Sequence, residues 1–394
     1  MSRLSRRSET PPFHVMEILK AVAVRQQTHN DVILLCVGQP STGAPVDARE
    51  AATRAIGDGV LGYTEAVGNR DLREQIAAHY EQWYGVHVGP DQIVLTTGSS
   101  AGFTAVFLAA FDPGDRVVVT RPGYPAYRNT LHTLGCEVVE LDCGPQTRYQ
   151  PTVEMLEALP QKPAGLVLAS PANPTGTVIP DADLAAVVDW CEANDCLLIS
   201  DEIYHGITYG DTVAQTAWKH GREAVVVGSF SKYFSMTGWR LGWLLLPEHL
   251  ARPVELLLGN LNLCPPAVSQ AAALGAFTES AQIELRQHVA RYARNRELLI
   301  SRLPDIGVTD AIAPDGAFYA YVDIGHLTDD SLGWCRDVLD ATGVAITPGI
   351  DFAPVGTGDR ALDGDRFVRF SFSGTDAEID EAFDRLRDYV RDRG

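Results

Sequence analysis

The sequence SFSKYFSMTGWRLG, residues 229–242, brings an amine, several hydroxyls and a guanidinium close together. Ser229 and Ser231 precede Lys232, and Arg240 follows it. Hydroxyl groups and a bidentate guanidinium are donors that hold a phosphate dianion. Neighbouring positive charge and desolvation both lower the pKa of a lysine, so the amine of Lys232 loses its proton more readily. The stretch therefore predicts an anchored phosphate beside a reactive amine.

Pyridoxal 5'-phosphate is a phosphorylated aldehyde with which such an amine forms a Schiff base. Ser-x-Ser-Lys at 229–232, followed by Gly-x-Arg-x-Gly at 238–242, resembles the cofactor-lysine motif of the class I/II aminotransferases. The alternative for Lys232 is a solvated surface lysine, which the flanking aromatics, glycines and serines disfavour. Further matches to this family occur in the family's order between residues 13 and 390.

Length, charge and cysteine content disfavour several other classes of protein. The chain has 394 residues, 45% of them hydrophobic, and a formal net charge of -19. This length allows two packed domains, and the acidity disfavours nucleic acid or an anionic membrane surface as a partner. No apolar run approaches the ~20 residues that span a bilayer, and no secretory signal is evident, so we expect a cytoplasmic protein. The seven scattered cysteines predict reduced thiols, with neither a metal site nor a disulfide framework.

Apolar strands alternate with helical patterns along the chain, which predicts an α/β protein. The resemblance implies a large domain with a mostly parallel central sheet of the seven-stranded type, flanked by helices. It also implies a smaller α+β domain formed by the N-terminal segment and the C-terminal part. We expect a flexible tail at 1–12, an N-terminal segment at 13–44, a large cofactor-binding domain at 45–285 and a small domain at 286–394. Helices are expected at 13–24, 69–83, 252–262 and 267–300, and an early strand at 32–37.

A turn of small residues follows the expected strand 92–97 and precedes an apolar helix. The N–H groups at such a helix N-terminus bind anions, and the helix dipole adds to this. Ser99, Ser100 and Ala101 are therefore the expected phosphate cradle. The alternative is a serine-rich turn that only caps the helix. Neither a Rossmann fingerprint nor a P-loop is present.

Polar side chains follow several other expected strands, where an open α/β sheet places its ligands. The resemblance implies that Tyr124 stacks on the cofactor ring and that Asn173 hydrogen-bonds its phenolic oxygen. A carboxylate such as Asp201 can keep the pyridine nitrogen protonated. Tyr204 is expected beside the phenolic oxygen with Asn173. The alternatives are a core tyrosine at 124, a simple turn at 173 and an acidic N-cap at 201.

Gly38, Asn173 and Arg369 are expected at the substrate. An arginine within the apolar strand 367–372 needs an anionic partner, because burying it unpaired is costly. Val368-Arg369-Phe370-Ser371 also resembles the family's substrate-carboxylate motif. A structural salt bridge is the alternative for Arg369, and a turn glycine is the alternative for Gly38.

The segment Gly62-Tyr63 to Gly68 resembles the one whose tyrosine contacts the cofactor phosphate of the other subunit. The resemblance thus implies a homodimer with shared active sites, although an ordinary loop tyrosine is the alternative. It further implies ping-pong transfer of an amino group from an L-amino acid to a 2-oxo acid. Lys232 would be both the Schiff-base lysine and the proton shuttle, and Lys232, Asp201 and Tyr204 the catalytic residues.

Two other functions compete with transamination. One is β-elimination or decarboxylation on the same cofactor, and the other is a non-catalytic regulatory domain. The lack of a basic helix-turn-helix extension before residue 13 disfavours the regulatory domain. For the substrate, residues 260–266 are neutral and no second recognisable arginine is present, whereas Phe13 and Val15 offer an apolar wall. We therefore expect neutral apolar or aromatic donors, with 2-oxoglutarate or pyruvate as acceptor.

Overall fold

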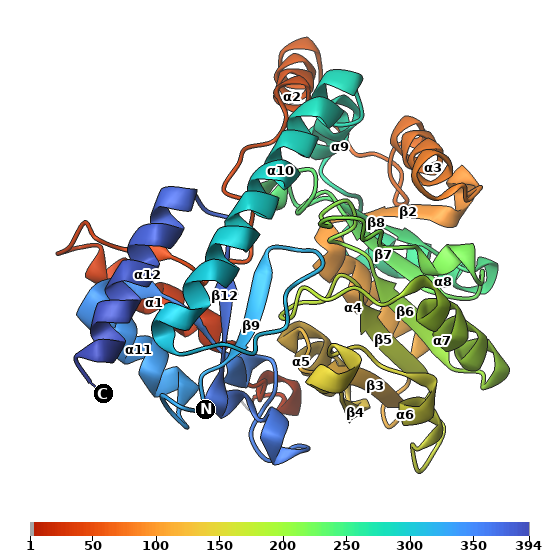
Figure 1. Cartoon of the computed structure of the whole chain (residues 1–394). Coiled ribbons are helices and arrows are strands. Elements are labelled where there is room, and N and C mark those ends of the chain that lie inside the picture. Colours follow the sequence, from red (N-terminus) through yellow and green to blue (C-terminus); the bar gives the residue numbers. More distant parts are fainter. Residues whose placement is uncertain (1–3, 394) are drawn as a thin grey trace.

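A seven-stranded sheet forms the centre of the larger part of the chain in the computed structural model, which describes residues 4–393 (Figure 1). The strand order is β2-β8-β7-β6-β5-β3-β4, and β8 runs antiparallel to both of its neighbours while the other pairs are parallel. This confirms the predicted fold class. The strands are β2 (Ile93–Thr96), β3 (Arg116–Arg121), β4 (Glu137–Asp142), β5 (Gly165–Ala169), β6 (Leu197–Asp201), β7 (Val225–Ser229) and β8 (Gly242–Leu245).

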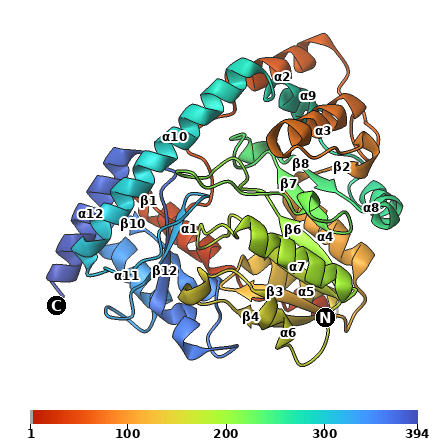
Figure 2. The same cartoon turned by 45° about the vertical axis from the view of Figure 1, so that its right-hand side comes forward.

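Helices cover both faces of this sheet (Figures 1 and 2). Successive strand residues point to opposite faces, so the apolar runs of the central strands serve two cores. Val117 and Val167 pack in one core with side chains of α4, α5 and α8. Val118 and Leu166 belong to a second core with side chains of α3 and α7. The helices are α1 (His14–Arg25), α2 (Val46–Asp58), α3 (Arg70–Tyr84), α4 (Gly98–Ala110), α5 (Pro125–Leu134), α6 (Val153–Glu157), α7 (Asp181–Ala193), α8 (Glu248–Leu261), α9 (Ala267–Gly275), α10 (Glu279–Arg302), α11 (Ser331–Thr342) and α12 (Asp376–Arg391).

A second, smaller set of strands lies beside α11 and α12 (Figure 1). It consists of the antiparallel sheet β11-β12-β9 and the parallel pair β1-β10. The pair joins the N-terminal segment to the C-terminal part, as the resemblance implies. Of the described helices, none combines the length and apolarity that crossing a membrane requires. The strands are β1 (Ile33–Leu34), β9 (Tyr319–Asp323), β10 (Val344–Ala345), β11 (Thr347–Pro348) and β12 (Phe367–Ser371).

Two expectations about single elements are corrected, and one helix is added. The helix expected at 267–300 is two helices, α9 and α10, because Thr278 starts a new helix by accepting a hydrogen bond from the Ala281 N–H. The strand expected at 32–37 is ordered as a strand only at Ile33–Leu34. Helix α2 was not expected. It packs against α9 where Gly275 has no side chain, since a Cβ there would lie 2.5 Å from the carbonyl oxygen of Asp47.

The described part of the expected N-terminal tail contains some regular structure. Residues Arg6–Ser8 form one turn of 3₁₀ helix, and the Thr10 hydroxyl lies 3.0 Å from the hydroxyl of Thr133 on α5. The part of the expected tail at residues 1–3 lies outside the described residues.

Candidate active site

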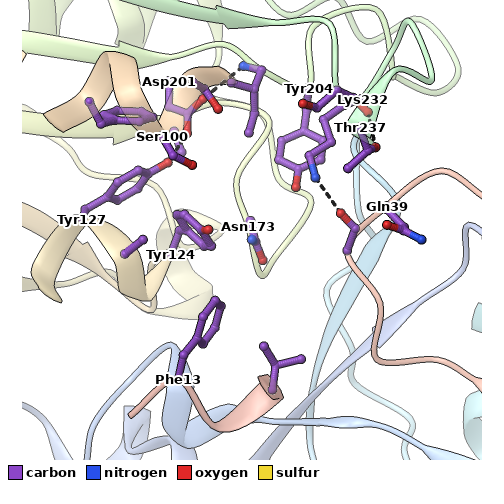
Figure 3. Close-up of a pocket in the computed structure, with 18 of the residues that line it drawn as sticks. Phe13, Gln39, Ser100, Tyr124, Tyr127, Asn173, Asp201, Tyr204, Lys232 and Thr237 are labelled. Atoms are coloured by element: carbon purple, nitrogen blue, oxygen red, sulfur yellow. Dashed lines mark hydrogen bonds between the residues drawn. The ribbon is translucent and has the colours of Figure 1, made fainter. Parts of the chain in front are cut away.

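The parallel strands β3, β5, β6 and β7 end at one edge of the central sheet, and a cavity of about 360 Å³ opens there. Loops after these strands, the N-terminus of α4, helix α1 and strand β12 contribute its walls. Figure 3 shows Lys232 and Tyr204 on one side of the cavity, and Tyr124 and Tyr127 on another. The predicted site residues in its lining are Gly38, Ser99, Ser100, Tyr124, Asn173, Asp201, Tyr204, Ser231, Lys232, Arg240 and Arg369.

Lys232 follows β7 and points into the cavity. Its Nζ donates to the Gly38 carbonyl oxygen at 2.5 Å and lies 5.5 Å from the centre of the Tyr204 ring (Figure 3). Burial, and to a smaller extent the charge of Arg369, lower the pKa of Lys232 to about 8, while the charge of Asp201 opposes the shift. A deprotonated amine is therefore accessible near neutral pH. The sequence analysis predicted that desolvation and a neighbouring cation lower this pKa. It took Arg240 to be that cation, but Arg240 lowers the pKa less than Arg369 does.

Asp201 is the last residue of β6 and is buried at the cavity wall. Burial raises the pKa of this carboxyl to about 6. Its Oδ2 accepts a hydrogen bond from the Tyr127 hydroxyl, and its Oδ1 accepts one from the Ile203 N–H at 3.1 Å. A buried carboxylate in this position fits a protonated pyridine nitrogen, which would supply the missing positive charge. The acidic N-cap alternative does not hold, because the N–H that Asp201 accepts from lies in a turn rather than a helix.

Tyr127 is a site residue that the sequence analysis missed. It lies in the first turn of α5, three residues after Tyr124, and the two rings meet edge to face with centroids 5.3 Å apart. The only sequence signal was this three-residue spacing at the end of the expected loop 121–125. Helix α5 was not expected, and only on a helix does such a spacing place two side chains on the same face, so Tyr127 was not singled out.

The phosphate end of the cavity is built on the N-terminus of α4. Gly98 has φ +75°, and a Cβ there would lie 2.4 Å from Nη2 of Arg240, so the guanidinium packs directly on the start of the helix. A Cβ on Gly242 would lie 2.9 Å from the backbone nitrogen of Ser99. Two glycines thus allow a guanidinium, helix N–H groups and the hydroxyls of Ser99 and Ser100 to converge, which is a donor set that fits a phosphate.

Two predicted phosphate residues do not line the cavity. The Ser229 hydroxyl is buried and accepts a hydrogen bond from the Ser231 N–H at 3.0 Å, so it shapes the lysine loop from within. Ala101 lies in the first turn of α4 and is not among the residues that line the cavity. Ser231 lines the cavity, and its carbonyl oxygen accepts a hydrogen bond from Thr237 at 2.7 Å.

Arg369 of β12 is a buried cation with neutral partners. Its Nη1 donates to Oδ1 of Asn173 at 2.9 Å, and its Nη2 donates to the Cys36 carbonyl oxygen at 2.8 Å. Its Nε has no hydrogen-bond partner, and among residues 4–393 no carboxylate lies within 4.0 Å of the guanidinium. The structural salt bridge is therefore not what holds Arg369. The guanidinium is therefore buried, has no counter-ion and lines the cavity. Such a group fits the carboxylate of a substrate.

Gly38 is a glycine because its backbone lies against a tyrosine. A Cβ at this position would come within 2.5 Å of the Tyr319 hydroxyl, and that hydroxyl is 2.8 Å from the hydroxyl of Tyr204. Close backbone approach therefore explains Gly38 better than a turn does. Tyr319, which also lies under the Arg369 guanidinium at 4.3 Å, is a second site residue that the sequence did not single out.

The buried side chain of His205 connects the segments that follow two of the strands. His205 donates from Nε2 to the Ser170 carbonyl oxygen at 3.0 Å, and its Nδ1 accepts from the Tyr84 hydroxyl at 2.7 Å. Burial lowers the pKa of His205 to about 3, so the ring is neutral. Burial also raises the pKa of the adjacent Glu202 to about 8. His205 thus ties the loop that carries Asn173 to the turn that carries Asp201.

The remaining wall of the cavity is apolar and comes from the first helix. Phe13, Val15, Met16 and Leu19 line it, as was expected for the first two. The Phe13 ring meets Tyr124 edge to face with centroids 6.1 Å apart (Figure 3). Tyr63, by contrast, is 85% exposed and does not line the cavity of its own chain, so its role across a dimer stays a prediction.

Comparison of the whole chain with known proteins shows which family it belongs to. The model of the family described as aminotransferase class I and II matches residues 30–386. The chain is 53% identical over 390 residues to the valine–pyruvate aminotransferase of Mycobacterium tuberculosis, with 98% of each chain covered. It is 31% identical over 391 residues to the aspartate/prephenate aminotransferase of Thermus thermophilus, again with 98% of each covered. A crystal structure of an aminotransferase from Mycobacterium tuberculosis matches with a TM-score of 0.95, 51% identity and 100% of both chains covered.

A lysine, a buried carboxylate and a phosphate cradle at the edge of this sheet define a pyridoxal-phosphate enzyme. The chain belongs to the aminotransferase class I and II family, and it moves an amino group from an amino acid to a 2-oxo acid. The predictions of family, reaction and cofactor are confirmed. The lyase, decarboxylase and regulatory-domain alternatives are not favoured, since the relatives are named aminotransferases.

Proposed function

We propose that this aminotransferase prefers neutral amino acids with apolar side chains, such as valine, as donors and a small 2-oxo acid such as pyruvate as acceptor. The observation that carries this is the charge of the described cavity lining. Its cations are Lys232, Arg240 and Arg369. Their proposed partners are the cofactor aldehyde, the cofactor phosphate and the substrate α-carboxylate, respectively. No fourth cation among residues 4–393 lines the cavity to hold a second carboxylate, and the α1 wall is apolar. The name of the Mycobacterium tuberculosis relative points to the same substrates.

The site residues have the following proposed roles. Bound pyridoxal phosphate supplies an aldehyde that condenses with amines and a ring that accepts electrons from the substrate α-carbon. Arg240, Ser99, Ser100 and Ser231 would hold its phosphate. Tyr124 would pack against its ring, Asn173 and Tyr204 would hydrogen-bond its phenolic oxygen, and Asp201 would pair with its ring nitrogen.

Lys232 carries the cofactor and then moves the proton. Its lowered pKa, about 8, would let Nζ accept a proton from the α-carbon of a bound substrate and give it up again within the same site. Arg369 orients the substrate by its α-carboxylate in both halves of a ping-pong cycle, and the Gly38 backbone and Asn173 lie beside that carboxylate. The burial of these groups excludes water, which strengthens their interactions with a bound substrate.

A panel of amino donors tests the proposal. We expect kcat/KM for valine, leucine, phenylalanine and alanine, with pyruvate as acceptor, to exceed that for aspartate and glutamate by at least about tenfold. The physical reason is that a dicarboxylate would bury a second negative charge against the apolar α1 wall. A preference for aspartate or glutamate would contradict the proposal and would point to a cation supplied by another subunit.

We also propose a homodimer with shared active sites. Gln270 donates to the Thr64 hydroxyl at 3.1 Å and to the Pro265 carbonyl oxygen at 2.9 Å, so the segments 60–64 and 261–265 lie side by side. Together they expose several large apolar side chains, which favours coverage by a partner. A second copy of the chain would cover them and bring Tyr63 to the partner's phosphate. These exposed side chains are Val60, Leu61, Tyr63, Leu261 and Leu263.

Replacing Tyr63 by phenylalanine tests the shared site. We expect cofactor retention to weaken by the ~0.5–1.5 kcal/mol of one hydrogen bond, or somewhat more because the acceptor is charged. Equilibrium dialysis of the cofactor measures this, and Tyr149→Phe, at a position outside the cavity lining, is the control. Sedimentation should give a dimer for both proteins, and a fully active monomer would rule out the shared site.

Two further proposals concern the whole chain. We infer that it works in the cytoplasm, a location compatible with the seven cysteines being free thiols. We also infer a large domain at 45–285 and a small domain at 286–394, with the N-terminal segment 13–44 packing against the small domain. The long helix α10, which runs from α9 toward α12, would connect the two (Figure 2).

A further inference from the structure

Helix α1 is held at its N-terminus by a carboxylate from the other end of the chain. Oδ1 of Asp351 accepts a hydrogen bond from the His14 N–H, and Oδ2 accepts one from the Val15 N–H, both at 2.7 Å. Asp351 is only 2% exposed. Phe13, the residue at the N-cap, provides no side-chain cap of its own. Both oxygens of one buried side chain therefore fix the direction in which α1 leaves the cavity.

The same short segment also supports the arginine that binds the substrate carboxylate. Asp351 ends the 3₁₀ helix Gly349–Asp351, which directly follows β11. Thr347 of β11 is paired in register with Arg369, and its hydroxyl accepts a hydrogen bond from Arg369 Nη2 at 3.2 Å. The α1 wall and the Arg369 guanidinium are therefore both positioned from residues 347–351.

A third contact keeps Asp351 in place against the larger sheet. Its backbone carbonyl oxygen accepts a hydrogen bond from Nη2 of Arg128 on α5 at 3.1 Å, and Nη1 of Arg128 pairs with Glu140 at 3.0 Å. Charge-assisted hydrogen bonds of a carboxylate to helix N–H groups are strong, and the helix dipole adds to them. Asp351 is thus a rigid link between α1, the Arg369 strand and α5.

We propose that Asp351 is a positioning residue for donor specificity: it fixes Phe13 and Val15 at a set distance from Arg369 and so selects the length of the donor side chain. The proposal rests on the proposed preference for neutral apolar donors. A donor is bound by its α-carboxylate at Arg369 and by its side chain against α1. The spacing between these two contacts decides which side chains fit, and Asp351 sets that spacing.

The test compares Asp351→Ala, Asp351→Asn and the control Asp330→Ala in the cofactor-loaded enzyme. Asp330 is the control because its side chain also caps a helix, α11, by accepting from the Gly333 N–H at 2.9 Å, at an exposed position outside the cavity lining. The measured quantity is the ratio of kcat/KM for valine to that for alanine. Alanine has too short a side chain to depend on α1, so it reports the state of the rest of the site.

We expect Asp351→Ala to lower the valine-to-alanine ratio by about tenfold, chiefly through KM for valine. Asp351→Asn presents an amide N–H₂ to one of the two backbone N–H groups, so we expect a smaller loss in the same direction. Asp330→Ala should leave the ratio unchanged. If Asp351→Ala does not fold, Asp351→Asn decides the question.

An unchanged ratio in the folded Asp351 variants would overturn this inference while leaving the proposed function intact. An equal fall in Asp330→Ala would overturn it too, because the effect would then reflect general loss of stability. A wild-type enzyme that turns over aspartate and not valine or alanine would instead refute the proposed function. The cofactor absorbance of each variant shows whether the site is loaded.

Discussion

Replacement of Lys232 by alanine is expected to abolish transamination, with a loss in kcat of at least about 10⁴-fold. The side chain is the nucleophile that carries the cofactor, and it is also the base that moves the substrate proton, a contribution of about 10²–10⁴-fold by itself. Both roles depend on the burial that lowers its pKa to about 8. Of the described lysines, only Lys232 lines the cavity, so no other can take over the role.

The measurement combines steady-state rates with mass spectrometry after borohydride reduction. Wild type should gain the mass of a covalently reduced cofactor, whereas Lys232→Ala should not. Lys219→Ala is the control, since Lys219 lies at the surface, paired with Asp181 at 2.8 Å. Near-normal turnover of Lys232→Ala would refute the assignment of the catalytic lysine.

Replacement of Arg369 by leucine is expected to have the second large effect on activity. We expect kcat/KM for amino acids to fall by about 30- to 5,000-fold, which corresponds to the ~2–5 kcal/mol lost when one partner of a buried charge pair is truncated. Most of the loss should lie in KM, because Arg369 holds the substrate and does not move a proton. Asn173 and the Cys36 carbonyl would also lose the donor they now accept from.

Two comparisons make this result specific. A primary amine that has the donor's side chain but lacks the carboxylate should be converted equally slowly by wild type and Arg369→Leu. Arg369→Lys keeps the charge and loses the planar fork, so we expect an intermediate loss for amino acids. An equal fall for the amine and for the amino acid would mean that Arg369 supports the fold and does not bind the carboxylate.

Much of the site was predictable because its residues follow strands. Asn173 and Lys232 follow apolar strands of the central sheet and Asp201 ends one, and such strands end at the same edge when they run parallel. A local motif with a mechanism, such as the lysine between serines and an arginine, can be interpreted without coordinates. Of the residues predicted to hold the phosphate, Ser99, Ser100, Ser231 and Arg240 line the cavity, whereas Ala101 and Ser229 do not.

The sequence by itself determined the family, the α/β fold and the cofactor, because these depend on short motifs and on the order of strands, and the same motifs predict the reacting lysine. Only the tertiary structure decided which side chains meet. Tyr127 reaches Asp201 across 74 positions of sequence, and Asp351 reaches His14 across 337. Such contacts follow from how helices pack on the sheet. Hydrogen bonds to buried groups form wherever packing brings a donor within reach, and no local pattern records that distance.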